Sequence, residues 1–494
     1  MSQKAALQTQ ALCVFRWSYP IFYMFDRAMA YCCRTESQPI TDSDIQQYGA
    51  KVFSEKMFFR ERRREMIFDQ RHKDCHSCWS IEDSGVKSPR LEDFFTTQLR
   101  KVGEVRPQEN LTEFLRRSRD RLVSGQIDDS LLTTAAVDIL EIVLSNACGF
   151  KCVYCNEFYS SSWAAEKRAA QRLHANYRDK SRDPQLEALF YEWVEANARD
   201  LVKRLGYIGG EPIAIEAFYE SLERMREIFE KVPARARKPE LCITTNLCPP
   251  DQQFERFTQM IPKMETRFRW VVQVSMESLG PRAEYIRYGT NWPKLERNLH
   301  RLLRDFPNVE VVILPTLNLL ALPSLPEFLS YLRDLHRQYG CSLELVQNMV
   351  TLPRALSPLS APKEFAVPLR RSIAMLTEWA EELAPVAQFD QPSENEVVLR
   401  SRMQASHWRS YAKYLDGVAQ RIEMNPSANA ASPTGNSHDQ QLQLWRELRQ
   451  ELEFWDLRRG TSAVKAIPEL AEIWRVAQDG RRSMESGADK GANR

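Results

Sequence analysis

The sequence feature that most constrains the fold is a trio of cysteines directly after a short apolar segment. Cys148, Cys152 and Cys155 follow the segment Val137–Leu144, whose valine and isoleucine content favours a β-strand. In a loop after a strand, the spacing C-x3-C-x2-C can bring three sulfur atoms together. A cubane iron–sulfur cluster needs four ligands, so three local thiolates would leave one iron open for a ligand that the protein does not supply.

The spacing alone leaves two other uses of these cysteines open. A structural zinc site needs a fourth protein ligand such as histidine. No histidine lies within fifteen residues of Cys155, so zinc would require a distant fourth ligand. The thiols could also be unliganded core residues, since free cysteine is often buried.

From about Leu131 onward, short apolar segments alternate with amphipathic ones. This alternation is typical of a parallel α/β fold, in which helices connect the strands. Six segments are expected to be strands: Val137–Leu144, Leu205–Ile208, Leu241–Thr245, Trp270–Ser275, Val309–Leu314 and Leu343–Met349. Ligands in such folds bind at the carboxyl ends of the strands, so we expect the functional residues there.

Polar side chains follow several of the expected strands. After the second strand comes Gly209–Pro212, where two glycines let the backbone approach a ligand beside the carboxylate of Glu211. Taken alone, this tetrapeptide is most simply a strand-to-helix turn with proline near the first helical position. The third and fourth strands end in Thr245, Asn246, Ser275 and Glu277. Such side chains can bind a ribose diol and an amino-acid head group, although strand-end capping explains each one individually.

The cysteine trio, with Tyr154 immediately before its last member, resembles the signature of the radical S-adenosylmethionine (SAM) enzymes. The resemblance implies a partial (βα)6 TIM-like radical SAM barrel. It also implies a [4Fe–4S] cluster on Cys148, Cys152 and Cys155, with the amino and carboxylate groups of SAM on the fourth iron. Reduction of such a cluster cleaves SAM to methionine and a 5′-deoxyadenosyl radical, which abstracts a hydrogen atom from the substrate.

The same resemblance assigns SAM contacts to individual residues. Gly209, Gly210, Glu211 and Pro212 match the motif that binds the amino group of SAM, with Glu211 at the matching position. Tyr154 would pack near the adenine, and Arg287, rather than Arg282, would clamp the SAM carboxylate. Surface salt bridging is the alternative for both arginines. The candidates for the ribose, carboxylate and adenine surroundings are Thr245, Asn246, Ser275, Glu277, Thr316 and Asn348.

A second group of cysteines precedes the expected barrel, namely Cys13, Cys32, Cys33, Cys75 and Cys78. The C-x2-C pair of Cys75 and Cys78 can chelate and needs two more ligands to complete a tetrahedral or cubane site. The block Cys75–Gly85 resembles the cysteine-bearing auxiliary modules, called SPASM or twitch domains, of many radical SAM enzymes. Those modules usually follow the barrel, whereas these cysteines precede it. These cysteines could hold an auxiliary iron–sulfur cluster, bind zinc or remain unliganded thiols.

Composition shifts divide the chain into six expected parts. These are an N-terminal auxiliary region with a candidate iron–sulfur site at 1–128, the barrel at 129–385, a helical extension at 386–425, a flexible linker at 426–440, a C-terminal helical segment at 441–480 and a disordered tail at 481–494. The C-terminal helical segment carries an apolar stripe, formed by Leu442, Trp445, Leu448, Leu452 and Trp455. We expect this stripe to dock on the barrel; contact with a substrate or partner peptide is the alternative.

Composition excludes some classes of function. A chain of 494 residues with net charge +2 and 43% hydrophobic residues is typical of a soluble globular protein of two to four domains, not of a nucleic-acid or membrane binder. The aromatic segment Trp17–Phe25 is too short to span a bilayer. Eleven cysteines without an export signal indicate a reducing compartment, so we expect a cytoplasmic protein.

The sequence therefore predicts an oxidoreductase of the radical SAM type that acts on a peptide or protein side chain by oxidation, cross-linking or a related modification. An auxiliary cluster could accept the electron left on the substrate, and relatives with such modules act on peptides. The expected electron donor is a flavodoxin or ferredoxin. Three alternatives stay open: a small-molecule substrate such as a sugar, nucleotide or amino acid; a zinc-stabilised interaction or nucleic-acid-binding protein without catalysis; and a relative that binds the cluster without cleaving SAM.

Overall fold

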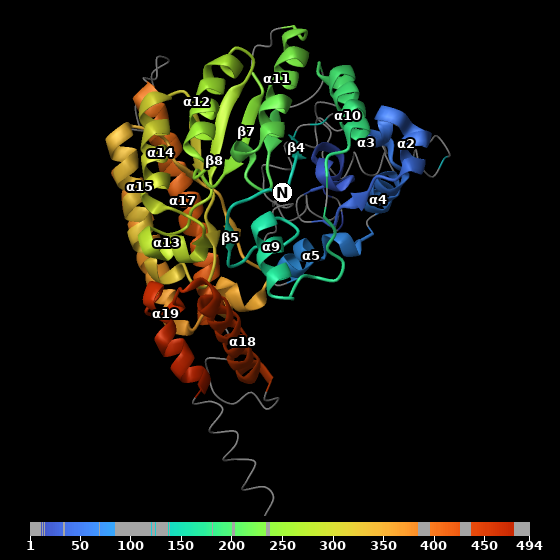
Figure 1. Ribbon diagram of the computed structural model, residues 1–494. Coiled ribbons are helices and arrows are strands. Elements are labelled where there is room, and N and C mark those ends of the chain that lie inside the picture. The colour runs from blue at the N-terminus through green and yellow to red at the C-terminus, as the bar shows by residue number, and fades with distance from the viewer. Residues whose placement is uncertain are drawn as a thin grey trace, which may run out of the picture. The chain divides into compact units, whose positions relative to one another are not determined.

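The computed structural model describes residues 11, 13, 15–32, 35–68, 70–83, 120, 124, 137, 139–179, 181–199, 203–233, 238–383, 396–424 and 436–478. The chain divides into two compact units. The first unit comprises Met1–Ala147, His174–Thr244 and Pro250–Trp270, and the second comprises Cys148–Leu173, Thr245–Pro249 and Val271–Arg494. Each unit is described by itself below (Figure 1).

A mainly parallel sheet forms the centre of the first unit, with the strand order β7-β6-β4-β1-β2-β3. Its strands are β1 (Pro20–Tyr23), β2 (Ala28–Tyr31), β3 (Gln38–Pro39), β4 (Ile139–Val143), β6 (Arg204–Tyr207) and β7 (Glu240–Thr245). β4, β6 and β7 are parallel, in a register that pairs Leu140 with Leu205 and Leu205 with Leu241. Because these strands are apolar on both faces, they suit a sheet covered by helices on its faces.

The aromatic segment near the N-terminus supplies a strand that the sequence analysis did not predict. β1 pairs in parallel with β4, so that Phe22 lies opposite Ile142, and β2 returns antiparallel to β1. Phe22 packs edge to face on Phe53 and Phe190, with ring centroids 4.9 and 5.5 Å apart. The segment is buried nearly throughout and lacks the alternation of polar and apolar residues by which a strand is usually recognised.

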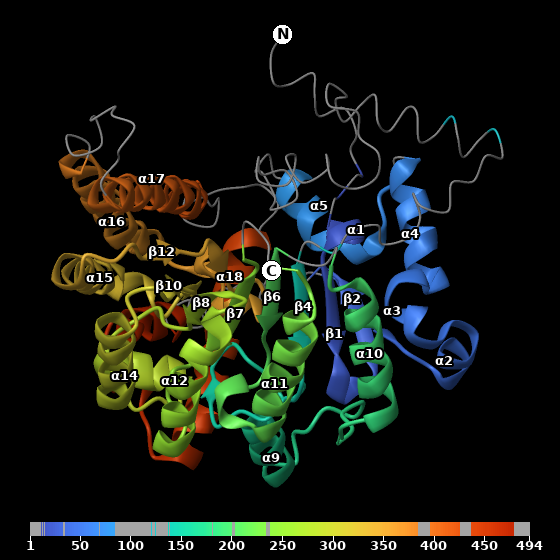
Figure 2. The same ribbon diagram turned by 90° about the horizontal axis from the view of Figure 1, so that it is seen from above.

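The helices of the first unit are α1 (Phe15–Ser18), α2 (Asp42–Tyr48), α3 (Val52–Glu55), α4 (Met57–Ile67), α5 (His76–Asp83), α10 (Pro184–Asn197), α11 (Glu216–Glu230) and α12 (Asp251–Glu265). Local sequence explains where several of them begin. Thr41 and Asp44 form a capping box at the start of α2, and the Asp183 carboxylate accepts hydrogen bonds from the first turn of α10. Figure 2 shows α10, α11 and α12 on one side of the strands of this unit.

The second unit contains three parallel strands in the order β8-β10-β12. β8 (Arg269–Val274) pairs with β10 (Glu310–Ile313), and β10 pairs with β12 (Glu344–Leu345). Two small sheets accompany them: β11 (Thr316–Leu317) is parallel to β13 (Asn348–Met349), and β5 (Lys151–Cys152) is antiparallel to β9 (Arg287–Tyr288).

The helices of the second unit are α9 (Ser161–Ala169), α13 (Gly280–Ile286), α14 (Trp292–Asp305), α15 (Leu325–Tyr339), α16 (Ala366–Glu382), α17 (Glu396–Glu423), α18 (Asn436–Arg459) and α19 (Ala463–Ala466). α16 and α17 pack side by side (Figure 2). The five stripe residues of α18 are at most 4% exposed, and the Trp445 indole donates to the Ser360 carbonyl over 2.8 Å. Docking of the stripe, the first of the two expectations, is thus confirmed within this unit.

All six segments expected to be strands contain strands, and a mixed α/β fold with parallel sheets is confirmed. The sixth segment is broken into β12 and β13, because the chain leaves its pairing with β10 and pairs with β11 instead. The tail at 481–494 and most of the expected linker at 426–440 lie outside the described residues. Among the helices of the described residues, each is too short or too polar to cross a bilayer.

Candidate functional site

The three cysteines after β4 lie in one compact loop of the second unit. The Cys155 amide donates to the Cys152 carbonyl over 3.0 Å, and the Phe150 amide donates to the Cys148 sulfur over 3.4 Å. The Cys152 thiol interacts electrostatically with the thiols of both other cysteines. The structure therefore brings together the three residues expected to hold a cluster.

The first turn of α9 fixes the backbone of this loop. Its side chains donate to three loop carbonyls: Ser162 to Cys148 over 2.7 Å, Ser160 to Phe150 over 2.7 Å and Trp163 to Cys152 over 2.9 Å. The Ser160 hydroxyl also accepts from the Trp163 amide and thereby caps α9. The run Ser160–Trp163 was not singled out from the sequence; three serines before a tryptophan at the start of a helix were the available signal.

A two-residue strand pairing holds the other side of the loop. Cys152 lies opposite Arg287 in the β5–β9 pair, and the Val153 amide donates to the Ile286 carbonyl over 2.9 Å. Gly289 follows with φ +113, and a Cβ there would lie 2.9 Å from the Phe150 ring. Only glycine fits this position, because the conformation and the contact both exclude a side chain.

Glu277 and Arg287 form a buried ion pair beside Cys152. The Arg287 Nε and Nη2 atoms donate to Glu277 Oε2 over 2.9 and 2.6 Å, and the Tyr154 hydroxyl donates to Glu277 Oε1 over 3.0 Å. Burial by itself would lower the pKa of Arg287, but Glu277, Tyr154 and Cys152 outweigh burial and the pKa is raised. Three residues expected to contact SAM are therefore in contact with one another.

Burial raises the pKa of the Cys152 thiol, and the nearby Arg287 opposes this effect only in part. The pKa of Cys155 is also raised by burial. Burial therefore disfavours the thiolate form of both cysteines.

The other candidates of the second unit also meet at strand ends. The Ser275 amide donates to the Thr245 carbonyl over 2.9 Å. The Thr245 hydroxyl accepts from the Leu247 amide and the Asn246 side chain from the Cys248 amide, each over 2.9 Å, so both contribute to capping their own turn. Thr316 and Asn348 lie opposite each other in the β11–β13 pair, with Asn348 Nδ2 3.5 Å from the Thr316 hydroxyl.

Gly209–Pro212 lies in the first unit and packs against the segment that leads into the cysteine loop. The Glu211 amide donates to the Ala147 carbonyl over 2.8 Å. A Cβ on Gly210, whose φ is +54, would lie 2.6 Å from that carbonyl oxygen and 2.8 Å from the Ser145 oxygen. Gly210 therefore lies close to the backbone of Ser145 and Ala147, where the sequence predicted a close approach to a ligand. Glu211 is buried.

Two buried polar atoms lack a hydrogen-bond partner among the described residues and fit a ligand. One is the Asn146 side-chain amide, Nδ2, two residues before Cys148 in the first unit. The other is the hydroxyl of Tyr411 on α17, a residue that is 1% exposed and interacts electrostatically with Glu277 in the second unit. An unsatisfied buried polar group costs about 1–3 kcal/mol, so such groups usually contact a ligand or water. Neither residue belongs to a motif that could have identified it from the sequence.

The thiol loop supplies three sulfur ligands from one short segment, Cys148, Cys152 and Cys155. Across the described residues, no group of three cysteine, histidine, aspartate or glutamate side chains that could hold one metal ion is found. Cysteine thiolates are the usual ligands of iron–sulfur clusters, and three of them would leave one iron of a cubane open. The chemistry of this donor set therefore fits the implied [4Fe–4S] group.

The C-terminal end of α18 also contacts this region of the second unit. The Arg459 Nε atom donates to Glu166 on α9 over 3.0 Å, and Lys151 of the loop forms an ion pair with the same carboxylate over 3.1 Å. The Arg459 guanidinium lies 4.4 Å from the centre of the Tyr288 ring. The cysteine loop is thereby tied to a helix far along the chain, which sequence spacing could not predict.

Four of the five N-terminal cysteines are described, and each is 7% exposed: Cys13, Cys32, Cys75 and Cys78. They lie in the first unit and come from the segments before α1, after β2 and around the start of α5. Cys33 lies outside the described residues. The buried Arg16 side chain lies beside them, and its Nη2 atom donates to the Cys75 sulfur over 3.4 Å.

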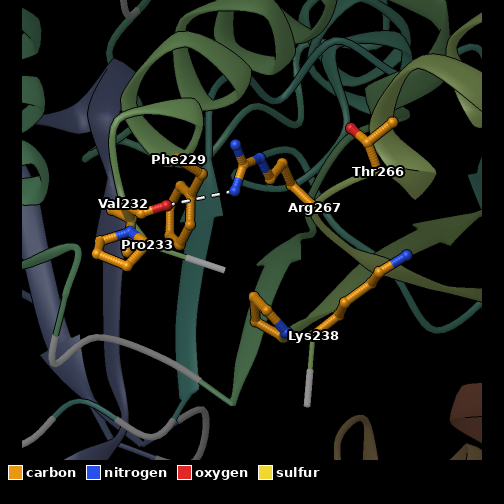
Figure 3. A pocket seen from close by; sticks show the side chains of 7 residues that line it. Phe229, Val232, Pro233, Lys238, Thr266 and Arg267 are labelled. Atoms are coloured by element: carbon orange, nitrogen blue, oxygen red, sulfur yellow. Dashed lines mark hydrogen bonds between the residues drawn. The ribbon is translucent and has the colours of Figure 1, made fainter. Parts of the chain in front are cut away.

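A pocket of the first unit is lined by residues that follow α11 and α12 or precede β7, among them Val232, Lys238 and Arg267 (Figure 3). Its two cations stabilise helix ends. Arg267 donates to the Val232 and Glu230 carbonyls at the end of α11, and Lys238 donates to the Glu265 carbonyl at the end of α12. We therefore assign this pocket no function.

No protein-family model matches the chain, and no curated protein matches it. The solved structures similar to it include the following three. One is hexahistidine-tagged anSMEcpe with bound AdoMet, with 18% identity over 50% of this chain and 62% of that chain and a TM-score of 0.33. Streptococcus suis SuiB bound to its precursor peptide SuiA has 12% identity, 67% and 62% coverage, and a TM-score of 0.31. SuiB bound to S-adenosylmethionine has 12% identity, 73% and 66% coverage, and a TM-score of 0.33. The chain thus spans less than two thirds of the length of these proteins.

Proposed function

We propose that this protein is a radical SAM enzyme whose cluster is held by Cys148, Cys152 and Cys155. The observation that carries the proposal is the compact cysteine loop, which α9 fixes on one side and β9 on the other. A loop held in this way presents three sulfurs in a set geometry, as a cluster requires.

Cys148, Cys152 and Cys155 would hold a [4Fe–4S] cluster, which, once reduced, would supply the electron for cleavage of SAM to methionine and a 5′-deoxyadenosyl radical. The chain's own residues would hold this group, orient it and exclude water from it. Arg287 provides a buried positive charge beside Cys152, and Glu277 fixes the orientation of that guanidinium through two hydrogen bonds. The Trp163 indole donates a hydrogen bond to the Cys152 carbonyl. This bond would keep Cys152 in place when the cluster is reduced or oxidised.

The proposed SAM contacts follow the family resemblance. Glu211, with Gly209, Gly210 and Pro212, would bind the amino group, and Thr245, Asn246, Ser275 and Glu277 would bind the ribose and carboxylate. Tyr154, Thr316 and Asn348 would lie near the adenine. Arg287 already pairs with Glu277. We therefore propose that its positive charge offsets the negative charges of the SAM carboxylate and of the cysteine thiolates.

We propose a peptide or protein side chain as the substrate, on the basis of the resemblance of Cys75–Gly85 to auxiliary modules found in peptide-modifying relatives. The reaction would be an oxidation, a cross-link or a related modification in the cytoplasm, with a flavodoxin or ferredoxin as electron donor. A sugar, nucleotide or amino acid is the alternative substrate class. A gene for a short precursor peptide beside this one would favour the peptide.

Anaerobic reconstitution followed by reduction tests the proposal. With dithionite and SAM, the full-length protein should form 5′-deoxyadenosine, measured by liquid chromatography, and should absorb at about 400 nm as iron–sulfur proteins do. Cys152→Ala should abolish 5′-deoxyadenosine formation. Cys341→Ala, outside the loop, should retain it. A colourless protein that contains zinc and yields no 5′-deoxyadenosine would overturn the proposal.

A further inference from the structure

One side of α17 in the second unit carries four residues that we call the α17 row: Ser410, Tyr414, Gly417 and Arg421. Their spacing of four, three and four residues places them on the same side of the helix. α17 packs against β12 (Figure 2), and Gln347, just after β12, donates to the Ser410 hydroxyl over 2.8 Å. The row therefore begins at the carboxyl end of a parallel strand, where ligands bind in such folds.

Arg421 is half-buried, and no residue in the part of the chain that the structure describes forms an ion pair with it. Its Nε atom donates to the Gly417 carbonyl of its own helix over 3.2 Å. Burial lowers the pKa of Arg421, and the side chain that opposes this effect is Tyr414. A phenol is neutral at pH 7, so it supplies no counter-charge. A partly desolvated guanidinium of this kind fits an anionic ligand.

The neighbouring carboxylates of α17 are paired elsewhere. Asp416 and Glu423 both bind Arg370 on α16, with Glu423 Oε2 2.6 Å from Arg370 Nη2. At 3.6 residues per turn, these two acids lie on a different side of α17 from Arg421. The guanidinium of Arg421 therefore projects away from the acids that could neutralise it.

Open space adjoins the middle of the α17 row. A Cβ added to Gly417 would meet no neighbouring atom within 4 Å. Glycine is unfavourable in the interior of a helix, where alanine would stabilise it. Tyr414 lies about one turn before this glycine and Arg421 about one turn after it. A ligand group can therefore approach the backbone of α17 between an aromatic ring and a guanidinium.

Tyr411 connects the row to the candidate SAM contacts. It is 1% exposed, its hydroxyl has no hydrogen-bond partner among the described residues, and it interacts electrostatically with Glu277. Its ring centre lies 5.6 Å from that of Tyr414. A series of contacts within the second unit therefore runs from Glu277 through two aromatic rings to the α17 row.

We propose that the α17 row is a substrate subsite in which Arg421 binds a carboxylate of the substrate. The planar fork of a guanidinium fits a carboxylate through two parallel hydrogen bonds. Arg421 is in this account a specificity-determining residue, and Gly417 leaves room for the bound group. The inference rests on the proposed function for the reaction that follows, whereas binding of the carboxylate needs no catalysis.

The length of the row favours a peptide over a single amino acid or a sugar. Arg421 follows Tyr411 by ten residues, which is roughly 15 Å along a helix. An extended peptide advances about 3.3 Å per residue, so this span corresponds to roughly four or five residues. We therefore expect the carboxylate about four or five residues away from the side chain that reacts. It belongs either to an acidic side chain or to the C-terminus of the peptide.

Peptide binding to the full-length protein, followed by ligand-observed NMR, tests the subsite. The probes are pentaglycine peptides, acetylated and amidated at their ends, whose central residue is replaced by glutamate or by glutamine. The glutamate peptide should bind about tenfold more tightly or better, because a guanidinium binds a charged acceptor more strongly than a neutral one. A third probe, acetylated pentaglycine with a free C-terminus, offers the other source of a carboxylate.

Preference for either carboxylate peptide over the glutamine peptide would support the subsite, and the tighter of the two would identify the source. No preference for a carboxylate would overturn the inference. The proposed function is judged separately by 5′-deoxyadenosine formation. Either result can therefore fail while the other stands.

Variants of Arg421 test its role with the same probes. Arg421→Gln should weaken binding of the preferred peptide by about tenfold or more. Arg421→Lys keeps the charge without the fork and should recover part of the affinity, which a purely structural role would not produce. Arg370→Gln is the matched control, because it removes an arginine from exposed ion pairs on another side of α17 and should bind like the parent. Undiminished binding by Arg421→Gln would refute the assignment.

Gly417→Leu tests the open space independently of charge. Leucine favours a helix more than glycine does, so the variant should fold, as measured by its melting temperature. Its side chain would occupy the space beside Arg421, and the preferred peptide should bind as weakly as it does to Arg421→Gln. Gln420→Leu, at an exposed position of the same helix, is the control and should bind like the parent. Full binding by Gly417→Leu would place the carboxylate elsewhere and overturn the inference.

Discussion

Arg287 places a positive charge beside the cysteine loop and forms a buried ion pair with Glu277. Glu277 is 2% exposed and accepts from both Arg287 and Tyr154. A buried pair stabilises the protein only while both partners and their hydrogen bonds are present. The pair therefore couples folding of the second unit to the electrostatics of the thiols.

Replacing Glu277 by glutamine should destabilise the protein and lower 5′-deoxyadenosine formation. The substitution leaves Arg287 buried without its carboxylate, and breaking a buried pair costs about 3–5 kcal/mol. Denaturant unfolding and the cleavage assay measure the two effects. Glu220→Gln, which breaks an exposed pair with Arg182, should cost less than about 1 kcal/mol. Equal stability of the two variants would contradict the role given to Glu277.

Tyr411→Phe should keep the fold and weaken the reaction. Its hydroxyl has no partner among the described residues, so its removal sacrifices no internal hydrogen bond, while a bond to bound ligand worth about 0.5–1.5 kcal/mol would be lost. We expect a drop of roughly 2- to 12-fold in kcat/KM for SAM cleavage. Tyr339→Phe, whose hydroxyl bonds His300 over 2.6 Å, should instead affect stability alone. Full activity in Tyr411→Phe would show that the hydroxyl contacts only water.

At the scale of elements, α9 acts as the support of the cysteine loop. Its first turn supplies three donors to loop carbonyls, and its Glu166 binds Lys151 of the loop and Arg459 of α18. One helix therefore joins the cysteine loop to the C-terminal helices of the second unit.

Ser162→Ala should loosen the loop at Cys148. The substitution removes a 2.7 Å hydrogen bond to the Cys148 carbonyl, which is partly buried and would lose a side-chain donor. Iron should be released to a chelator several times faster than from the parent. Ser330→Ala, whose hydroxyl donates to the Pro326 carbonyl within α15, is the control and should release iron at the parent's rate. Identical rates in all three proteins would argue against support by α9.

Glu166 should make the attachment of α18 depend on pH. Burial would raise the pKa of Glu166, but hydrogen bonds from Arg459 and Lys151 outweigh it and hold the pKa below its usual range. The stabilising contribution is therefore present above the unfolded pKa and is lost as the pH falls through the lower, folded value. The stability difference between the parent and Glu166→Gln should shrink as the pH falls through and below the usual range of a glutamate pKa. A difference that stays constant over this range would contradict the assignment.

At the scale of the whole molecule, a cluster on the proposed ligands Cys148, Cys152 and Cys155 should contribute to folding stability. Thiolate ligands bind metal only when the loop that carries them is folded, so binding would stabilise the native state. Removal of iron by an anaerobic chelator should lower the melting temperature of the reconstituted full-length protein. The variant that lacks Cys148, Cys152 and Cys155 should show a smaller change on the same treatment. A wild-type melting temperature that is insensitive to iron would contradict the proposed site.

The features that the sequence predicts well are those set by neighbouring residues. Apolar runs such as Trp270–Ser275 place the strands, and the spacing of Cys148, Cys152 and Cys155 identifies one loop. Residues whose role depends on distant partners were missed, including Ser160, Arg459 and Tyr411. No local pattern shows that a serine will meet a carbonyl ten residues away or that an arginine will reach another helix.

The packing of Gly210 has a mechanical consequence. The Gly210 backbone packs so closely against the carbonyl oxygens of Ser145 and Ala147 that a methyl group would not fit. The amide of the next residue, Glu211, donates a hydrogen bond to the Ala147 carbonyl. The turn that carries Glu211 and the peptide that enters the cysteine loop must therefore shift as one piece.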